Sequence, residues 1–123
     1  MAKILIVEDD ADNRAILRQQ LFHLGHEVVE TTTGFEALEW AGKEKPDLVI
    51  LDIMMPKIDG REVARRLRQD SKMKDVPILA ATVLFQKEDA ETCIEAGCTD
   101  ILVKPFNLKE LREKLQQLLP QKK

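Results

Sequence analysis

Short apolar runs alternate along the chain with longer segments in which apolar residues recur every three or four positions. Runs that are apolar at nearly every position are typical of parallel strands covered on both faces. The sequence contains five such runs, the second of them weaker than the others, at 4–7, 27–31, 48–51, 78–81 and 101–103. We expect these runs to be the strands of one sheet.

The segments between the runs have the spacing of amphipathic helices. The first predicted helix covers about 11–24 and the fourth about 87–96, with Gly97 as its C-terminal stop. Thr33, Asp59 and Asn107 each precede a glutamate by three positions, a capping-box pattern that predicts three further helix starts. Pro120 is predicted to end the last helix.

Five strands alternating with five helices predict an α/β fold with a parallel sheet and right-handed crossovers. For 123 residues we expect one domain, over 1–120, followed by a short tail at 121–123. The predicted architecture is a (βα)₅ flavodoxin-like three-layer sandwich with strand order 2-1-3-4-5.

The composition narrows the function classes. Hydrophobic residues make up 44% and charged residues 33% of a chain with net charge −3, which favours neither a nucleic-acid nor a membrane-surface partner. The basic stretch at 57–74 also carries acidic residues, so we interpret it as a solvated helix face, with a partner-docking surface as the second interpretation. Cys93 and Cys98 fit neither a disulfide framework nor a zinc motif, and we expect buried, inert thiols.

Polar residues follow four of the predicted strands. Glu8 and Asp9 follow the first strand, Asp52 the third, Thr82 the fourth and Lys104 the fifth. In a sheet of this order, ligands bind outside the carboxyl ends of the strands, at the point where the strand order reverses. Carboxylates gathered there repel one another, and a hard cation such as Mg²⁺ relieves the repulsion.

These five residues are the parts of a phosphoryl-transfer site. Asp52 is the candidate nucleophile, while Lys104 and Thr82 would neutralise charge on the phosphoryl oxygens. Each residue also has an ordinary explanation, because carboxylates cap helices, a threonine can simply end a strand, and a loop lysine can be solvated. Their joint occurrence at one edge of the sheet favours the functional interpretation.

Three segments also resemble a known family. ILIVEDD (4–10), PDLVILDIMMPKIDG (46–60) and EAGCTDILVKPF (95–106) are similar to the receiver domain of bacterial two-component response regulators. The resemblance implies that Asp52 is phosphorylated from a phosphohistidine and that Asp9 binds Mg²⁺ directly, with Mn²⁺ as a substitute. It further implies that Glu8 binds the metal through water and that Met54 contributes its backbone carbonyl.

The same resemblance assigns a switch. Thr82 matches the hydroxyl that moves toward the phosphoryl group, Lys104 matches the invariant lysine, and the Lys104–Pro105 bond is cis in similar domains. Ile101 departs from the family, which usually carries Tyr or Phe there as a ring that changes rotamer on activation. Because isoleucine is stiff at χ1, we expect a muted motion.

Three further positions depart from the family or vary within it. Val83 is bulkier than the small residue that usually follows the switch threonine. Met54 and Leu84 occupy positions that influence the access of hydrolytic water, and both are apolar. We therefore expect a long-lived phosphoryl group on Asp52.

The implied partners are a sensor histidine kinase or a histidine phosphotransfer protein, and a downstream target. The target would bind the face formed by the fourth helix, the fifth strand and the fifth helix. The chain is expected to be cytoplasmic, a monomer or weak dimer, and not an enzyme, although it assists its own phosphorylation and slow dephosphorylation. No output domain is expected, so the chain is either a stand-alone regulator or an excised receiver.

Two other classes use similar folds or similar sites. A flavin- or nucleotide-binding module would place Gly, Ser or Thr in the loop after the first strand, whereas this loop is acidic. A degenerate receiver, which acts by protein contacts without phosphorylation, usually lacks the acidic pair, the acceptor or the lysine. The sequence retains all of them.

Overall fold

The computed structural model describes residues 2–83 and 86–119, and these contain five strands, five α-helices and one short 3₁₀ helix. No helix in these two ranges is long and apolar enough to cross a membrane. The strands are β1 (Lys3–Val7), β2 (Glu27–Thr31), β3 (Leu48–Asp52), β4 (Ile78–Thr82) and β5 (Asp100–Val103). The helices are α1 (Ala11–His23), α2 (Gly34–Lys43), α3 (Gly60–Gln69), η1 (Ser71–Met73), α4 (Lys87–Ala96) and α5 (Leu108–Leu118).

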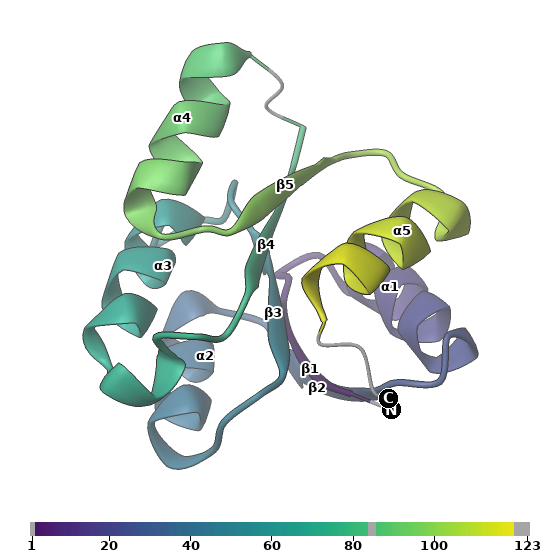
Figure 1. Cartoon of the computed structure of the whole chain (residues 1–123), viewed down its shortest axis with the longest axis horizontal. Coiled ribbons are helices and arrows are strands. Elements are labelled where there is room, and N and C mark those ends of the chain that lie inside the picture. The colour runs from purple at the N-terminus through teal and green to yellow at the C-terminus, as the bar shows by residue number, and fades with distance from the viewer. Residues whose placement is uncertain (1, 84–85, 120–123) are drawn as a thin grey trace.

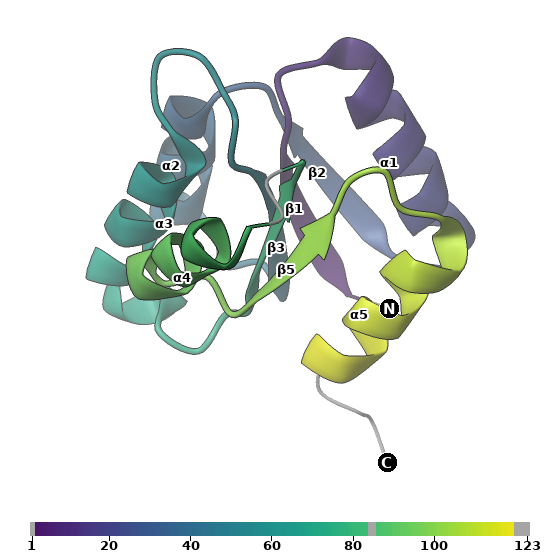
Figure 2. The ribbon, with the colours of Figure 1, turned by 90° about the horizontal axis from the view of Figure 1, so that it is seen from above.

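The strands form one parallel sheet in the order β2-β1-β3-β4-β5, which confirms the predicted topology. Helices α2, α3 and α4 cover one face of the sheet, and α1 and α5 cover the other (Figures 1 and 2). Because β1 and β3 are paired neighbours, the loops that follow them emerge side by side at the carboxyl edge. This edge carries the candidate residues.

Alternate residues of the central strands point to opposite faces and divide the core in two. In β1, Leu5 and Val7 pack with the buried side chains of α2, α3 and α4. Ile4 and Ile6 pack instead with Leu17 and other buried side chains of α1 and α5. A continuous apolar run is therefore required, because neither face of these strands meets water.

The helix starts follow the predicted residues, with differences in detail. Asn107 and Glu110 form the complete reciprocal capping box at α5. At α2, Thr33 accepts from the backbone N–H of Glu36, but the Glu36 carboxylate returns to Thr32 instead of Thr33. The capping-box prediction is therefore wrong in its second half at α2, because the neighbouring threonine offers both an N–H and a hydroxyl.

At α3 the predicted cap residue is confirmed but its glutamate has other partners, and at α4 the predicted C-terminal stop is confirmed. Asp59 caps α3 through the N–H of Arg61, while Glu62 pairs outward with arginines of its own helix. Gly97 adopts the left-handed conformation, with φ of 118°, that ends α4 as predicted. Pro120, the tail at 121–123 and Leu84 lie outside the described residues.

The basic stretch is only partly a solvated face. Arg65 is exposed, as predicted, but Arg68 turns its guanidinium into a cluster of backbone carbonyls. It donates to Gly97 at 2.9 Å, Met73 at 2.6 Å and Val76 at 2.7 Å. Arg68 therefore ties the end of α3 to the loops that precede β4 and β5.

Cys93 and Cys98 are both buried and free, as predicted. Burial raises the pKa of the Cys98 thiol to about 12 and also raises the pKa of Cys93. Both thiols stay protonated at neutral pH, which makes them poor nucleophiles.

Candidate functional site

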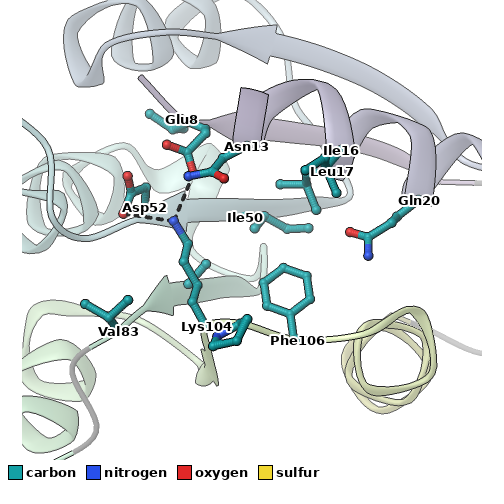
Figure 3. A pocket seen from close by; sticks show the side chains of 13 residues that line it. Glu8, Asn13, Ile16, Leu17, Gln20, Ile50, Asp52, Val83, Lys104 and Phe106 are labelled. Atoms are coloured by element: carbon teal, nitrogen blue, oxygen red, sulfur yellow. Dashed lines mark hydrogen bonds and ion pairs between the residues drawn. The ribbon is translucent and has the colours of Figure 1, made fainter. Parts of the chain in front are cut away.

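The carboxyl edge of the sheet brings the predicted site residues together. Glu8, Asp9 and Asp52 each offer a carboxylate oxygen, and these oxygens all lie within 4.8 Å of one another. The Nζ atom of Lys104 lies 2.9 Å from Glu8 Oε1 and 3.5 Å from Asp52 Oδ1 (Figure 3). Residues from three separate strand ends thus converge on one point, although they lie as far as 96 positions apart in the chain.

Asp52 is held in a fixed position at the end of β3. The residue is 6% exposed, and its Oδ1 accepts a hydrogen bond from the Met54 N–H at 3.2 Å. Behind it, α3 begins at Gly60, whose N–H donates to the carbonyl of Ile53 at 3.0 Å. A Cβ atom at Gly60 would lie 2.5 Å from the backbone oxygen of Asp52, so the absence of a side chain permits this approach.

The surroundings of Asp52 oppose its negative charge in the metal-free protein. Burial, together with the neighbouring Glu8 carboxylate, raises its pKa to about 7 despite the opposing charge of Lys104. Burial by itself would lower the pKa of Lys104, but the hydrogen bond to Glu8 and the charge of Asp52 together raise it. The site therefore has an excess of negative charge, which an added cation would compensate.

The loop after β1 presents its acidic residues in different ways. Glu8 is buried at 4% exposure, whereas Asp9 and Asp10 are exposed. Asp10 is the N-cap of α1, so its carboxylate faces the helix backbone instead of the site. Arg14 donates to the backbone carbonyl of Glu8 at 3.0 Å and supports the loop from behind, a role that the sequence analysis missed.

Thr82 and Lys104 lie at the ends of neighbouring strands. Thr82 is 1% exposed, and its carbonyl accepts from the Lys104 N–H at 2.8 Å. The Lys104–Pro105 peptide bond is cis, as the resemblance implies. Ile101 is half-buried and packs against the core beneath α2, α3 and α4, so the position that usually carries a ring is filled by an aliphatic side chain.

The flanks of the site are apolar and open. Met54 and Val83 are each 55% exposed, on the loops after β3 and β4. Neither side chain has a group that could orient a water molecule strongly. Both positions are therefore accessible to a large molecule that approaches Asp52 from solvent.

The donor set fits a divalent metal of the magnesium type. It consists of carboxylate oxygens alone, with one exposed member, Asp9, that leaves room for water. Mg²⁺ characteristically takes one or two carboxylates and retains several waters or phosphate oxygens. The excess of negative charge around Asp52 also favours binding of a divalent cation.

A groove of about 400 Å³ adjoins the site, and the sequence analysis did not foresee it. It runs from Asp52 and Lys104 between α1 and the segment that joins β5 to α5 (Figure 3). Its walls are mainly apolar and include Ile16, Leu17 and Phe106. The groove arises from the packing of two distant segments, so no local sequence signal marks it.

These features define a doubly wound α/β domain with an acidic site at the carboxyl edge of its sheet, which is where ligands bind in such folds. Residues 4–116 match the family of response regulator receiver domains. The chain belongs to this family.

Two solved structures illustrate the match. The chain superposes on the chemotaxis protein CheY4 of Vibrio cholerae with a TM-score of 0.93 and 37% identity, over 97% of this chain and 99% of that one. It superposes on the receiver domain of the sensor histidine kinase PA1611 of Pseudomonas aeruginosa with a TM-score of 0.89 and 33% identity, over 95% and 96% of the two chains. The latter structure has a magnesium ion coordinated in its active-site cleft.

The curated relatives include longer proteins. The chain is 46% identical to "Probable transcriptional regulator ycf27" of Guillardia theta, over 95% of this chain and 45% of that protein. It is 38% identical to the alkaline phosphatase synthesis transcriptional regulatory protein PhoP of Bacillus subtilis, over 95% and 48% of the two. The chain therefore spans about half the length of these relatives.

Proposed function

We propose that Asp52 accepts a phosphoryl group from a histidine kinase or a histidine phosphotransfer protein and thereby controls a downstream partner. The observation that carries the proposal is the convergence of three carboxylates within 4.8 Å beside the Lys104 ammonium. This arrangement supplies a nucleophile, a place for a cation and a fixed positive charge for a phosphoryl group.

The proposed metal is Mg²⁺, with Mn²⁺ as a substitute. Asp9 and Asp52 would bind it directly, Glu8 through water, and Met54 through its backbone carbonyl. The oxygen-only cluster supports this assignment, as does the magnesium ion in the related receiver of PA1611. When bound, the ion would neutralise charge on the phosphoryl oxygens.

The protein's own residues would then divide the work. Asp52 attacks phosphorus with the carboxylate oxygen that the Met54 N–H does not hold in place. Lys104, whose Nζ contacts both Glu8 and Asp52, would exchange part of this contact for a phosphoryl oxygen. Thr82, buried at the next strand end, would move toward the phosphoryl group as the switch hydroxyl.

The signal is proposed to leave through the face of α4, β5 and α5. Ile94 of α4 and Val103 of β5 are exposed apolar residues on this face, which supports a protein contact there. Ile101, packed under α4, is expected to take part with a muted motion. We propose that the chain works in the cytoplasm as a monomer or weak dimer, as a phosphoacceptor and not as a conventional enzyme.

A small phosphodonor or beryllofluoride, added with Mg²⁺, tests the proposal. The wild type should gain one phosphoryl group by intact-mass measurement and show chemical-shift changes at Thr82 and in α4. Asp52→Asn should show neither response. If the wild type fails to respond, the chain acts as a degenerate receiver and the proposal is wrong.

The metal assignment is tested by two nearby carboxylates, one in the loop after β1 and one in the first turn of α1. Asp9→Asn removes a proposed ligand and should weaken Mg²⁺ binding by about tenfold or more. Asp12→Asn removes an exposed carboxylate from the first turn of α1 and should leave the affinity unchanged. Equal losses in the two variants would mean that bulk negative charge, and not the cluster, attracts the ion.

The apolar flanks give an expectation for the lifetime of the phosphoryl group. Met54 and Leu84 occupy the positions that influence the access of hydrolytic water, and neither carries a polar group to orient it. The phosphorylated protein should therefore persist in Mg²⁺ for minutes or longer. Dephosphorylation followed by intact-mass measurement checks this. A half-life of seconds would contradict it.

A further inference from the structure

The groove beside Asp52 has two chemically different ends. At one end lie Asp52 and the ammonium of Lys104, and from there the groove passes over Ile50 toward Phe106 (Figure 3). Ile50 is fully buried beneath it, while Ile16 stands on the rim at 56% exposure. With the proposed cation held by the carboxylates beside Lys104, a ligand that fills this groove would carry a compact anion at one end and a hydrocarbon group at the other.

The charged end is already fitted to a phosphoryl group under the proposed function, on which this inference rests. A phosphorus atom bonded to Asp52 in the transition state expels its leaving group on the side opposite the attacking oxygen. Asp52 and Lys104 both line the groove, so the groove begins beside the reacting carboxylate. A leaving group longer than one or two carbons would therefore be able to lie along the apolar floor.

We propose that the groove binds the hydrocarbon part of a small acyl phosphate, so that this protein prefers phosphodonors with longer acyl chains to the two-carbon one. In the reaction, an oxygen of the Asp52 carboxylate forms a bond to phosphorus. The bond between phosphorus and the acyl oxygen breaks, and its electron pair leaves on the released carboxylate. No redox partner and no added proton are required.

The preference for longer acyl chains would come from burial of their methylene groups against the apolar floor of the groove. Each methylene removed from water contributes about 0.8 kcal/mol, which corresponds to roughly a fourfold increase in rate at low donor concentration. The increase should continue with each added carbon until the chain covers the floor, and then stop. Asn13 and Gln20 line the same groove from α1, so the chain would pass beneath polar side chains and not into open solvent.

The test is a series of straight-chain acyl phosphates from two to six carbons, with Asp52 phosphorylation followed by intact-mass measurement. The intrinsic reactivity of each donor at phosphorus is measured separately by its uncatalysed hydrolysis at neutral pH, which breaks the same bond between phosphorus and the acyl oxygen. We expect the corrected rate constant to rise about fourfold per methylene over the first additions. A flat or falling series, with normal use of the two-carbon donor, overturns this inference and leaves the proposed function intact. If Asp52 accepts from none of the donors, the proposed function fails as well.

Two variants of α1 locate the effect. Ile16→Ser removes apolar surface from the rim of the groove and should reduce the ratio of long-chain to short-chain rates several-fold. Phe22→Ser removes an apolar side chain that is 78% exposed on the same helix but lies outside the groove, and it should leave the ratio unchanged. An equal reduction in both variants, or in neither, contradicts the proposal.

A second measurement follows binding alone and does not depend on phosphoryl transfer. Alkylphosphonates of increasing chain length cannot transfer a phosphoryl group, and their binding in the presence of Mg²⁺ can be followed by NMR. The longer members should bind more tightly and perturb the methyl signals of Ile16, Leu17 and Ile50. Perturbations confined to the residues around Asp52, with no dependence on chain length, would show that the groove takes no part.

Discussion

The close approach of α3 to the strand that carries Asp52 makes Gly60→Ala an informative perturbation. Gly60 is the first residue of α3, and it has no positive φ, so alanine meets no backbone strain there. The obstacle is purely steric. A Cβ atom would lie 2.5 Å from the carbonyl oxygen of Asp52 and 2.6 Å from the Cα of Ile53.

The neighbouring atoms belong to the backbone and cannot rotate away. Ordinary contact begins at 3.4 Å, so α3 and the end of β3 must separate by several tenths of an ångström or more. Overpacking of this kind costs about 1–3 kcal/mol. The displaced segment includes the acceptor Asp52, so the variant should also lose alignment of the metal site, with Mg²⁺ affinity reduced by about tenfold.

Gly42→Ala is a matched control. Gly42 also lies in a helix, near the end of α2, but a Cβ atom there would have nothing within 4 Å. Replacing an exposed helical glycine by alanine should stabilise the fold by about 0.5–1 kcal/mol. Urea denaturation of both variants should therefore show changes of opposite sign, with a difference of roughly 2–4 kcal/mol.

A Mg²⁺ titration separates the effect of Gly60→Ala on stability from its effect on the position of Asp52. Gly60→Ala should bind the ion more weakly than wild type, and Gly42→Ala should bind it equally well. If Gly60→Ala is as stable as wild type and keeps its affinity, the close contact does not position Asp52. If stability falls while the affinity holds, the contact supports the fold alone.

Three more outcomes follow from the described contacts. Asp52→Asn removes a buried charge and should stabilise the metal-free protein by roughly 1–2 kcal/mol in thermal melts, while abolishing stabilisation by Mg²⁺. Arg68→Lys should destabilise by about 2 kcal/mol in urea, because a lysine cannot reach several carbonyls, whereas Arg65→Lys should have almost no effect. Cys93 and Cys98 should react with a thiol reagent at pH 8 only after unfolding.

The strands and the site residues were predictable because both follow from short-range patterns and one topological rule. An apolar run such as 48–51 can be read without knowledge of its partners, and the residue after it must lie at the carboxyl edge. Glu8, Asp52 and Lys104 therefore converge for the same reason that the strands are parallel. The structure extends β3 by one residue to include Asp52, which is within the usual uncertainty of strand ends.

The hydrogen bonds of Arg68 and Arg14 were not predicted, because they depend on which backbone carbonyls from other parts of the chain lie within reach. Arg68 belongs to a basic stretch that looks solvated, yet the loops before β4 and β5 present free carbonyls within its reach. Arg14 likewise meets the carbonyl of Glu8 only because α1 packs back across its own loop. Nothing in the local sequence separates these arginines from the exposed Arg65.

The neighbours of Ile101 explain what the replacement of the usual aromatic ring by an isoleucine does to the switch. It pairs with Ala80 in the sheet register, and its side chain packs against the core shared by α2, α3 and α4. A β-branched side chain in this position has few alternative rotamers, so it cannot exchange a buried for an exposed state as a ring can. Any change that begins at Thr82, two residues further along β4, must then pass through movement of the β5 backbone and of α4. We therefore expect phosphorylation to shift the amide signals of 100–103 and α4 more than the side-chain methyl signals of Ile101.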